Sequence, residues 1–241
     1  MNIADRIASG AIHLLFPPAC AACGAGIARG AVCEACRTSI RIHRHFFCAV
    51  CGARLPGPGL PRKICHPAAP LLLAAAGSYD DPVLKSLIHA LKFRGVRRAA
   101  EPLADLIARY LAATGFDPKG FILAPLPLHR RRRNRRGFNQ SEDIGRHLAR
   151  RLGMEFRTDL LVRIRHAKPQ TESASAAERA RNVAACFAVP RPGDTAQRKV
   201  IILDDVTTSG ATLAEAARTL RAAGARTVVG LAAAKARPVA P

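Results

Sequence analysis

The chain has 241 residues, and its 38 Lys and Arg residues against 17 Asp and Glu residues give a formal charge of +21 at neutral pH. About half of the residues are apolar, which supports a folded core and excludes general disorder. No apolar run reaches the roughly 18 residues of a transmembrane helix, and residues 1–16 lack the apolar stretch of a signal peptide. We therefore expect a soluble, cytoplasmic protein without a membrane span.

The positive charge comes mainly from arginine, with 31 Arg and only 7 Lys residues. The planar guanidinium group makes paired hydrogen bonds to phosphate, so this bias favours phosphorylated ligands or nucleic acid. Genome base content also produces Arg- and Ala-rich proteins, and both causes can contribute. Because a charge of this size gives non-specific binding to polyanions, it does not identify a partner.

The sequence divides into three parts that differ in composition. Residues 1–19 have loose helical spacing of apolar residues and are expected to form an N-terminal helix docked on the body. Residues 20–69 hold seven of the eight cysteines and little apolar periodicity. Residues 70–241 alternate apolar strands with amphipathic helices, which predicts an α/β domain with a parallel sheet. The Gly- and Pro-rich residues 57–70 form the expected boundary.

The cysteine-rich part predicts two zinc sites, because a CxxC pair places two thiolates on one tight turn, ready for two corners of a zinc tetrahedron. The first predicted site consists of Cys20, Cys23, Cys33 and Cys36. The second consists of Cys48, Cys51 and Cys65, with His66 as the fourth ligand because position 68 is Ala. His43 or His45 could replace His66, and an empty second site is a further alternative.

Disulfides and a redox motif are the alternatives to zinc. Paired CxxC spacing in an intracellular chain favours metal over disulfides. Thioredoxin-like redox motifs occur singly at a strand–helix junction, so they fit less well. Closed four-ligand sites predict one or two structural zinc ions, and Cys186 in its apolar stretch is expected to contribute packing alone.

In the larger part, apolar periodicity predicts helices over residues 82–93, 99–113, 141–152 and 211–223. Strands are predicted over residues 121–126, 160–165, 183–189, 199–203 and 227–233. The order strand, loop, helix, strand near the C-terminus predicts a right-handed crossover. Lys92 and Arg94, at the end of the first helix, are expected to be solvated.

Six arginines stand within seven positions, at Arg130, Arg131, Arg132, Arg133, Arg135 and Arg136. Such a run is typical of a solvated loop of repelling charges. Alternatively, Arg136 is structural or contacts a ligand, and the others form an electrostatic funnel or a path for nucleic acid. Phe138 is the one aromatic residue nearby in sequence, whereas dedicated single-strand binders present several stacking platforms. Residues 168–180, rich in Ser, Ala and Glu, are expected to form a mobile lid.

The most informative stretch is VIILDDVTTSGAT, residues 200–212, where an apolar strand ends in two carboxylates followed by hydroxyl residues and a helix. A loop at a helix N-terminus offers free backbone N–H groups to a phosphate, and Thr207, Thr208, Ser209 and Thr212 add hydroxyl donors. Gly210 lets the backbone approach the ligand closely. Asp204 and Asp205 suit ribose hydroxyls, with or without a divalent cation.

Three other interpretations of this stretch are weaker. A P-loop nucleotide site requires GxxxxGK[ST], and a Rossmann dinucleotide site requires GxGxxG after a strand; neither pattern occurs in the chain. A strand that simply ends in solvated acids before a helix cap does not explain four hydroxyl residues in one loop.

The stretch resembles the phosphoribosyl pyrophosphate (PRPP) signature of type I phosphoribosyltransferases. Three further segments narrow the resemblance to the ComF family: LIHALKFRG at 87–95, PLPLHRRRRNRRGFNQ at 125–140 and PQTESASAAERARNVAACFAV at 169–189. The resemblance runs from Cys20 to Ala233 and includes the cysteine-rich part. It implies a type I phosphoribosyltransferase fold, an open, mainly parallel sheet with helices on both faces, with a small N-terminal zinc-ribbon module.

The resemblance also implies roles for individual residues. Asp204 and Asp205 would hold the ribose hydroxyls of PRPP, and the loop Thr207, Thr208, Ser209, Gly210, Ala211 and Thr212 would hold its 5-phosphate. The loop Leu126, Pro127, Leu128, His129 and Arg130 would hold the Mg²⁺-bound pyrophosphate.

For function, the resemblance implies a PRPP-binding protein that handles single-stranded DNA during uptake or DNA use, with a DNA-translocating helicase as partner. The alternatives are a phosphoribosyltransferase acting on a base or amine, and a PRPP-regulated nucleic-acid-binding protein. The sequence shows no base-binding motif after the PRPP loop and no N-terminal catalytic Cys for glutamine hydrolysis.

Overall fold

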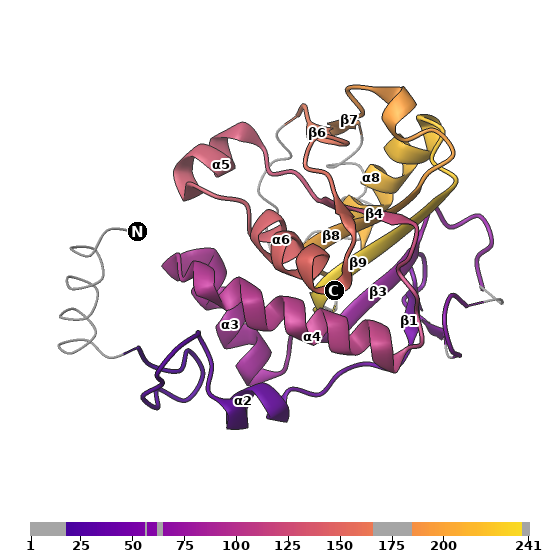
Figure 1. The fold of residues 1–241 in the computed structure, drawn as a ribbon. Coiled ribbons are helices and arrows are strands. Elements are labelled where there is room, and N and C mark those ends of the chain that lie inside the picture. The colour runs from indigo at the N-terminus through magenta and orange to yellow at the C-terminus, as the bar shows by residue number, and fades with distance from the viewer. Residues whose placement is uncertain (1–17, 56, 62–64, 166–184, 238–241) are drawn as a thin grey trace.

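The computed structural model describes residues 18–55, 57–61, 65–165 and 185–237. The predicted N-terminal helix falls almost wholly outside these residues, as does the predicted lid. The described chain builds one seven-stranded sheet with helices on both faces and a separate two-stranded ribbon (Figure 1).

The main sheet runs in the order β2-β1-β3-β9-β8-β4-β5. Pairing is parallel from β3 to β5, whereas β1 pairs antiparallel with both β2 and β3. A short antiparallel pair, β6 and β7, forms the second sheet. The strands are β1 Phe46–Cys48, β2 Arg54–Leu55, β3 Leu72–Ser78, β4 Phe121–Pro125, β5 Glu155–Phe156, β6 Val162–Arg163, β7 Phe187–Ala188, β8 Lys199–Thr207 and β9 Thr227–Lys235.

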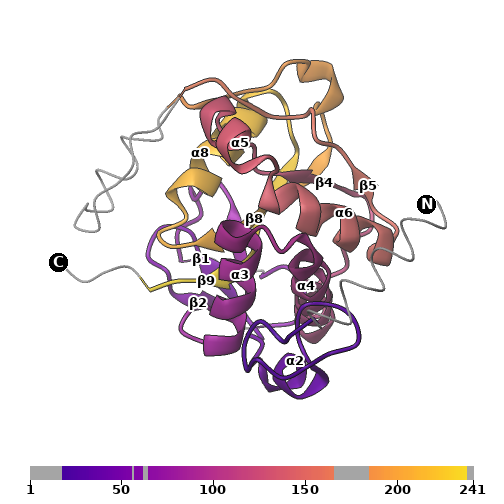
Figure 2. The same cartoon turned by 90° about the vertical axis from the view of Figure 1, so that its left-hand side faces the viewer.

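Three helices cover one face of the sheet and one covers the other. α3 (Pro82–Arg94), α4 (Ala100–Ala113) and α6 (Gln140–Leu152) bury their apolar faces in one core, and α8 (Ala211–Ala222) packs in a second core on the opposite face. Figures 1 and 2 both show α4 and α6 side by side. Within the described residues, no helix is both long enough and apolar enough to cross a lipid bilayer.

The helix boundaries follow from local chemistry. The Asp81 carboxylate accepts hydrogen bonds of 3.0 Å from the backbone N–H groups of Val83 and Leu84, and Pro82 fits the first turn of α3. Gly95 ends α3 in the left-handed conformation, at φ 66°. The apolar faces predicted for α3 and α4 are both buried.

β3 and β5 were not among the predicted strands, and three further differences bear on the site or on the domain boundary. β8 continues past Leu203 to Thr207, so the two acids belong to the strand itself. The arginine run is a helix, α5 (Arg130–Arg136), rather than a loop, because the His129 side chain caps its start and Gly137 ends it in the left-handed conformation. β1, within the cysteine-rich part, hydrogen-bonds to β3 across the predicted domain boundary.

The strand order reverses between β4 and β8. From β4 the chain passes through α6 to β5 on one side, and from β8 it passes through α8 to β9 on the other. At such a switch point the loops after the two strands diverge to opposite faces and leave a crevice at the carboxyl ends of the strands, where open α/β sheets bind ligands.

Candidate functional site

The two carboxylates of β8 lie at this crevice and are already engaged by the protein. Asp204 Oδ1 accepts hydrogen bonds from the Ser141 hydroxyl, at 3.1 Å, and from the Asp205 backbone N–H, at 2.8 Å. Asp205 is buried, and its Oδ2 lies 3.0 Å from the Lys92 ammonium nitrogen. The acids are thus fixed in place by α6 and by the end of α3.

Burial and the neighbouring charges shift the ionisation of this group. Burial, followed by the proximity of Asp205, raises the pKa of Asp204 above the ordinary carboxyl range, while Lys92 acts in the opposite direction. Burial lowers the pKa of Lys92, but the two carboxylates outweigh it and raise that pKa overall. The expectation that Lys92 is solvated is therefore wrong: α3 directs it to Asp205.

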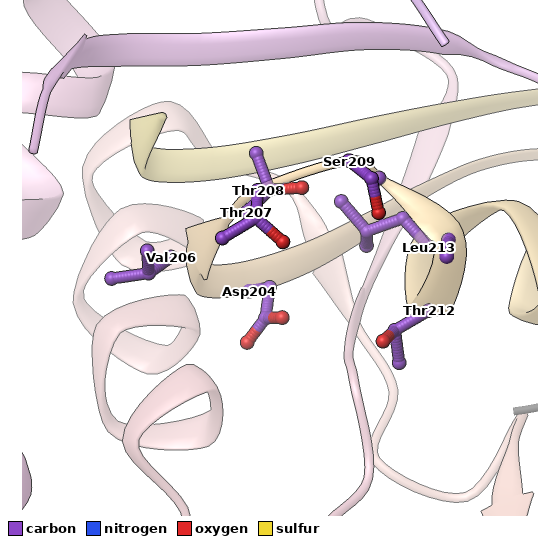
Figure 3. A pocket seen from close by; sticks show the side chains of 9 residues that line it. Asp204, Val206, Thr207, Thr208, Ser209, Thr212 and Leu213 are labelled. Carbon is purple, nitrogen blue, oxygen red and sulfur yellow. The ribbon is translucent and has the colours of Figure 1, made fainter. Parts of the chain in front are cut away.

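The hydroxyl-rich loop follows directly and forms the wall of a small pocket. Asp204 and residues 206–213 line a pocket of about 60 Å³. Figure 3 shows the hydroxyl oxygens of Thr207, Ser209 and Thr212 around a common space, with the Asp204 carboxylate at its edge. Gly210 caps α8 with φ 77°, a conformation that a side chain would strain. The first turn of α8 therefore offers its unpaired N–H groups at this pocket.

The loop after β4 is tied to the same site by hydrogen bonds. The Leu126 backbone N–H donates to the Leu203 carbonyl oxygen at 2.8 Å, and the Leu126 carbonyl accepts from Asn139 Nδ2 at 3.1 Å. The Asn139 side-chain oxygen in turn accepts from the Ser141 backbone N–H at 3.2 Å and caps α6. Leu126 consequently lies beside β8, next to the two acids, and Pro127, Leu128, His129 and Arg130 lead from it into α5.

Sequence reasoning missed three residues of this site: it assigned no role to Asn139 and Ser141, and it expected Lys92 to be solvated. Asn139 and Ser141 were visible only as polar residues opening a helix, within the segment that resembles ComF proteins. Lys92 also lies in such a segment, but its contact with Asp205 joins residues 113 positions apart. No local pattern predicts a contact of that span.

The arginine helix α5 follows β4 and lies on the side of the sheet where the parallel strands have their carboxyl ends (Figure 1). Arg136 is half-buried, donates a hydrogen bond of 2.7 Å to the Gln140 side-chain oxygen, and has its pKa lowered by burial. Its guanidinium carbon lies 6.0 Å from the ring centre of Phe93, which is 66% exposed. Arg131 and Arg135 are exposed, and Arg133 pairs with Glu142 at 3.4 Å.

A second pocket, of about 350 Å³, lies between the ends of α3 and α5. It is lined by aromatic rings and cations from both helices: Lys92, Phe93, Arg94, Arg135, Arg136 and Phe138. The sequence placed Phe138 alone near the arginines, whereas the fold adds Phe93. Aromatic and basic side chains therefore both line this pocket.

The cysteine-rich part contains two clusters of candidate metal ligands. One consists of Cys20, Cys23, Cys33 and Cys36, and the other of Cys48, Cys51, Cys65 and His66; within each, the ligand atoms lie within 4.8 Å of one another. His43 and His45 belong to neither cluster. The sulfur atoms of Cys23 and Cys33 are 3.8 Å apart, and those of Cys51 and Cys65 are 3.5 Å apart.

These clusters fit zinc in donor type and spacing. Zn–S bonds of about 2.3 Å in a tetrahedron separate the sulfurs by about 3.8 Å. Burial raises the pKa of Cys20, but hydrogen bonds from the backbone N–H groups of Cys23, Cys33 and Ala22 outweigh it and bring the pKa to about 6. The same balance, with backbone N–H groups of Cys51 and Val50, brings the pKa of Cys48 to about 6. Cys20 and Cys48 thus favour the thiolate that zinc requires, whereas hydrogen bonds with neighbouring thiols raise the pKa of Cys36 to about 12 and that of Cys65 to about 11.

The Nδ1 atom of His66 lies 3.4 Å from the sulfur atoms of both Cys48 and Cys65. His66 therefore completes a four-ligand set in the second cluster. Cys186, in contrast, is buried in the core beneath α8.

Comparisons with known proteins agree with both parts of the molecule. A family model described as a double zinc ribbon domain matches residues 11–68, and one described as a phosphoribosyl transferase domain matches residues 139–240. These matches, with the parallel sheet and the cysteine clusters, confirm a phosphoribosyltransferase fold with an N-terminal zinc-ribbon module and support structural zinc.

Three relatives align with most of the chain. DNA utilization protein YhgH of Salmonella typhimurium is 34% identical, over 82% of this chain and 87% of its own length. Competence protein F of Haemophilus influenzae is 29% identical, over 82% of this chain and 87% of its own. Competence protein ComFC of Bacillus subtilis is 26% identical, over 78% and 77%. The chain therefore belongs to the ComF family, the family of DNA utilization protein YhgH and the competence proteins F and ComFC.

Proposed function

We propose that this protein binds PRPP at the switch point between β4 and β8. Asp204 and Asp205 hold the ribose hydroxyls, and residues 207–212 hold the 5-phosphate. The loop from Leu126 to Arg130 holds the pyrophosphate, for which bound Mg²⁺ would neutralise charge. The observation that carries the proposal is the hydrogen-bonded link from Leu126 through Asn139 and Ser141 to Asp204, since it fixes the loop after β4 beside the carboxylate that precedes the hydroxyl-rich loop.

Calorimetric titration of the zinc-loaded protein with PRPP and Mg²⁺ tests this proposal. The double variant Asp204→Asn, Asp205→Asn should lose PRPP affinity by at least about tenfold, because two carboxylate acceptors for hydroxyl groups disappear. Asp117→Asn is the matched control. Asp117 is exposed and precedes β4, so it lies at the amino end of that strand, away from the crevice. Unchanged affinity in a folded double variant would refute the ribose assignment.

The cysteine clusters are proposed to hold one structural zinc ion each. Cys20, Cys23, Cys33 and Cys36 bind the first, and Cys48, Cys51, Cys65 and His66 bind the second. Metal analysis should then give two zinc ions per chain, and a value of one would remove the second site.

A second candidate function is binding of single-stranded DNA along α5. The specific observation in its favour is the exposed Phe93 ring beside Arg136, because a base can stack on a ring while arginines contact the phosphates. The names of the relatives, DNA utilization protein and competence protein, agree with such a role. A helicase that moves DNA would be a suitable partner.

The DNA proposal is tested by fluorescence anisotropy with a labelled single-stranded oligonucleotide at several salt concentrations. Replacing both Arg131 and Arg135 by Ala should reduce the slope of log affinity against log salt by up to about 1.4, or about 0.7 for each phosphate that is no longer neutralised. Arg150→Ala with Arg226→Ala is the matched control, because both arginines are exposed and lie near the amino ends of the strands, shortly before β5 and β9. Phe93→Ala should weaken binding without changing the slope. Equal effects of both arginine pairs would mean that the overall charge binds DNA.

Enzymatic transfer of phosphoribose is the alternative to a binding function. In such a reaction, a nitrogen atom of the acceptor forms a bond to the anomeric carbon while the bond to pyrophosphate breaks and its electrons leave with the pyrophosphate. Phosphorus NMR of the titrated sample detects this release. Turnover with one acceptor would establish an enzyme, and binding without turnover across bases and amines would favour the PRPP-binding module.

A further inference from the structure

A third pocket, of about 290 Å³, lies where the cysteine-rich part meets the carboxyl end of β9. His43, His45, Phe47 and Arg54 reach it from β1, its preceding loop and β2, and Lys235 and Arg237 reach it from the end of β9. The position was not singled out by any sequence motif, since it depends on the pairing of β1 with β3.

Flat rings form one wall of this pocket. The His43 and His45 ring centres are 5.2 Å apart and the His45 and Phe47 centres 4.7 Å apart, the second pair edge to face. The Lys235 ammonium lies 5.4 Å from the centre of the Phe47 ring. Ring walls of this kind favour a planar ligand, which can stack or meet the rings edge-on.

The two imidazoles provide polar atoms for a ligand. His43 Nδ1 lies 3.0 Å from the Ala75 carbonyl oxygen, so it carries the proton and leaves Nε2 as an acceptor in the neutral ring. His45 Nε2 is buried and has no hydrogen-bond partner among the described residues. Burial lowers the pKa of both histidines, that of His45 to about 4, and nearby cations add to this effect. A buried polar atom without a partner is uncommon in a folded protein and fits a site that a ligand completes.

The charge of the pocket is positive. Its lining contains Arg54, Lys235 and Arg237, and none of the described residues that line it is an Asp or Glu. Arg237 is paired with Asp80 at 3.0 Å, which leaves Arg54 and Lys235 as the cations facing the pocket. Lys235 also donates a hydrogen bond of 3.3 Å to the Thr208 carbonyl oxygen, so it joins this pocket to the hydroxyl-rich loop.

We propose that this pocket binds a planar heteroaromatic ligand that carries a negative charge. The rings contact its flat faces or edges, the imidazole nitrogens bind its polar ring atoms, and Arg54 and Lys235 bind its anionic group. This site is additional to the PRPP site. Arg54 belongs to the β1–β2 hairpin, which carries the CxxC pair of Cys48 and Cys51. A heteroaromatic carboxylate and a nucleotide share this chemistry, so the test includes both.

The probes are orotate, uracil and uridine 5′-monophosphate, titrated calorimetrically into the zinc-loaded full chain without PRPP. Orotate is uracil with an added carboxylate, so the difference between the two isolates the contribution of the charge. Arg54→Gln should weaken orotate binding about tenfold, since it removes one charge-assisted hydrogen bond. Arg44→Gln is the matched control, because Arg44 is an exposed neighbour in sequence that does not line the pocket. A PRPP titration of the same wild-type sample reports separately on the site at β8.

The proposal is supported if orotate or the nucleotide binds, uracil binds more weakly, and Arg54→Gln but not Arg44→Gln reduces affinity. The imidazole signals of His43 and His45 should then shift in NMR spectra of the complex. Orotate binding alone identifies a carboxylate ligand, and stronger binding of the monophosphate identifies a nucleotide. Absence of binding by both anions, or equal effects of the two arginine variants, would overturn the proposal, whether or not PRPP binds.

Discussion

Asp204 is a carboxylate whose charge is unfavourable for the folded chain, because it is buried beside a second carboxylate. Its raised pKa means that the folded state holds a proton at a pH where the unfolded chain has released it. The contribution of Asp204 to stability is therefore fully present below the ordinary carboxyl range and is lost as the pH rises through the raised pKa. At neutral pH the buried charge of Asp204 therefore weakens the unliganded fold, as expected of a residue kept for the proposed PRPP site.

Asp204→Asn should consequently stabilise the unliganded protein at neutral pH. Asn keeps the shape and the oxygen that accepts from Ser141 and from the Asp205 backbone, but it has no charge to bury. We expect a melting temperature higher by about 2–4 °C, which corresponds to about 1 kcal/mol for a chain of this size. The gain should disappear at a pH below the ordinary carboxyl range, where wild-type Asp204 is neutral in both states. A lower melting temperature at neutral pH would contradict the argument.

His66 offers a residue-level test of the second metal cluster. His66→Ala should reduce the zinc content measured by atomic emission from two to one, since it removes the fourth ligand. His66→Cys should retain two zinc ions, because a thiolate can occupy the same corner. Equal zinc content in the wild type and the Ala variant would mean that the imidazole is not a ligand.

The site residues that form a local sequence pattern could be predicted. Those that are distant in the sequence and are brought to the site by folding were missed. Asp204, Asp205 and the hydroxyl residues after them adjoin one another in the chain, so strand, loop and helix patterns were enough to place them. Lys92 is brought to Asp205 by the packing of α3 against the sheet. His66 was predicted as the fourth ligand with His43 and His45 as replacements, and the fold places His66 in the cluster and the other two outside it.

At the scale of elements, one side chain at the start of α6 both caps the helix and holds the loop after β4. Asn139 is buried, caps α6 with its oxygen and holds the Leu126 carbonyl with its nitrogen. This double role explains why a polar residue stands at that position between Phe138 and α6.

Asn139→Ala should lower the free energy of unfolding by about 1–2 kcal/mol, the usual loss for a helix cap, and should also weaken PRPP binding. Asn139→Ser restores a cap oxygen but lacks the nitrogen that reaches Leu126. The Ser variant should therefore recover part of the stability, measured by urea unfolding, without recovering PRPP affinity. Full recovery of both by Ser would show that the hydrogen bond to Leu126 has no role in binding.

The arginine run was predicted as a loop and is a helix, because charge repulsion and helix capping favour different conformations there. Repulsion among six guanidinium groups favoured a loop, yet a side-chain cap at His129 and the left-handed Gly137 delimit a helix of seven residues. The strand β3 was hard to predict for a different reason: its sequence LLAAAGS contains few residues with strong strand propensity. Its pairing with β9 and β1 decides its conformation.

At the scale of the molecule, β1 links the second cluster of metal ligands to the main sheet. The second cluster includes Cys48, the last residue of β1, and β1 pairs with β3 of the parallel sheet. The same β1 supplies Phe46 to the core beneath α4 and Phe47 to the opposite core. The α/β architecture was predictable from periodicity, but this long-range pairing was not, since three-residue strands leave almost no sequence pattern.

Removal of zinc with a strong chelator should therefore affect the whole molecule and not only residues 20–69. We expect a lower melting temperature and broadened NMR signals from residues of β3, because the hairpin that pairs with β3 loses its metal. Re-addition of zinc should restore both. Unchanged β3 signals after complete metal removal would show that the hairpin is held by packing alone.

Both outermost strands of the main sheet, β2 and β5, are only two residues long. Short terminal strands expose few free N–H and C=O groups, so they give a second molecule little backbone to pair with. If the β1–β2 hairpin detached, the seven-residue apolar strand β3 would become the new edge. By covering β3, the hairpin prevents self-association of the sheet. Zinc-depleted protein should therefore aggregate, as measured by light scattering, well below the temperature at which its helices melt.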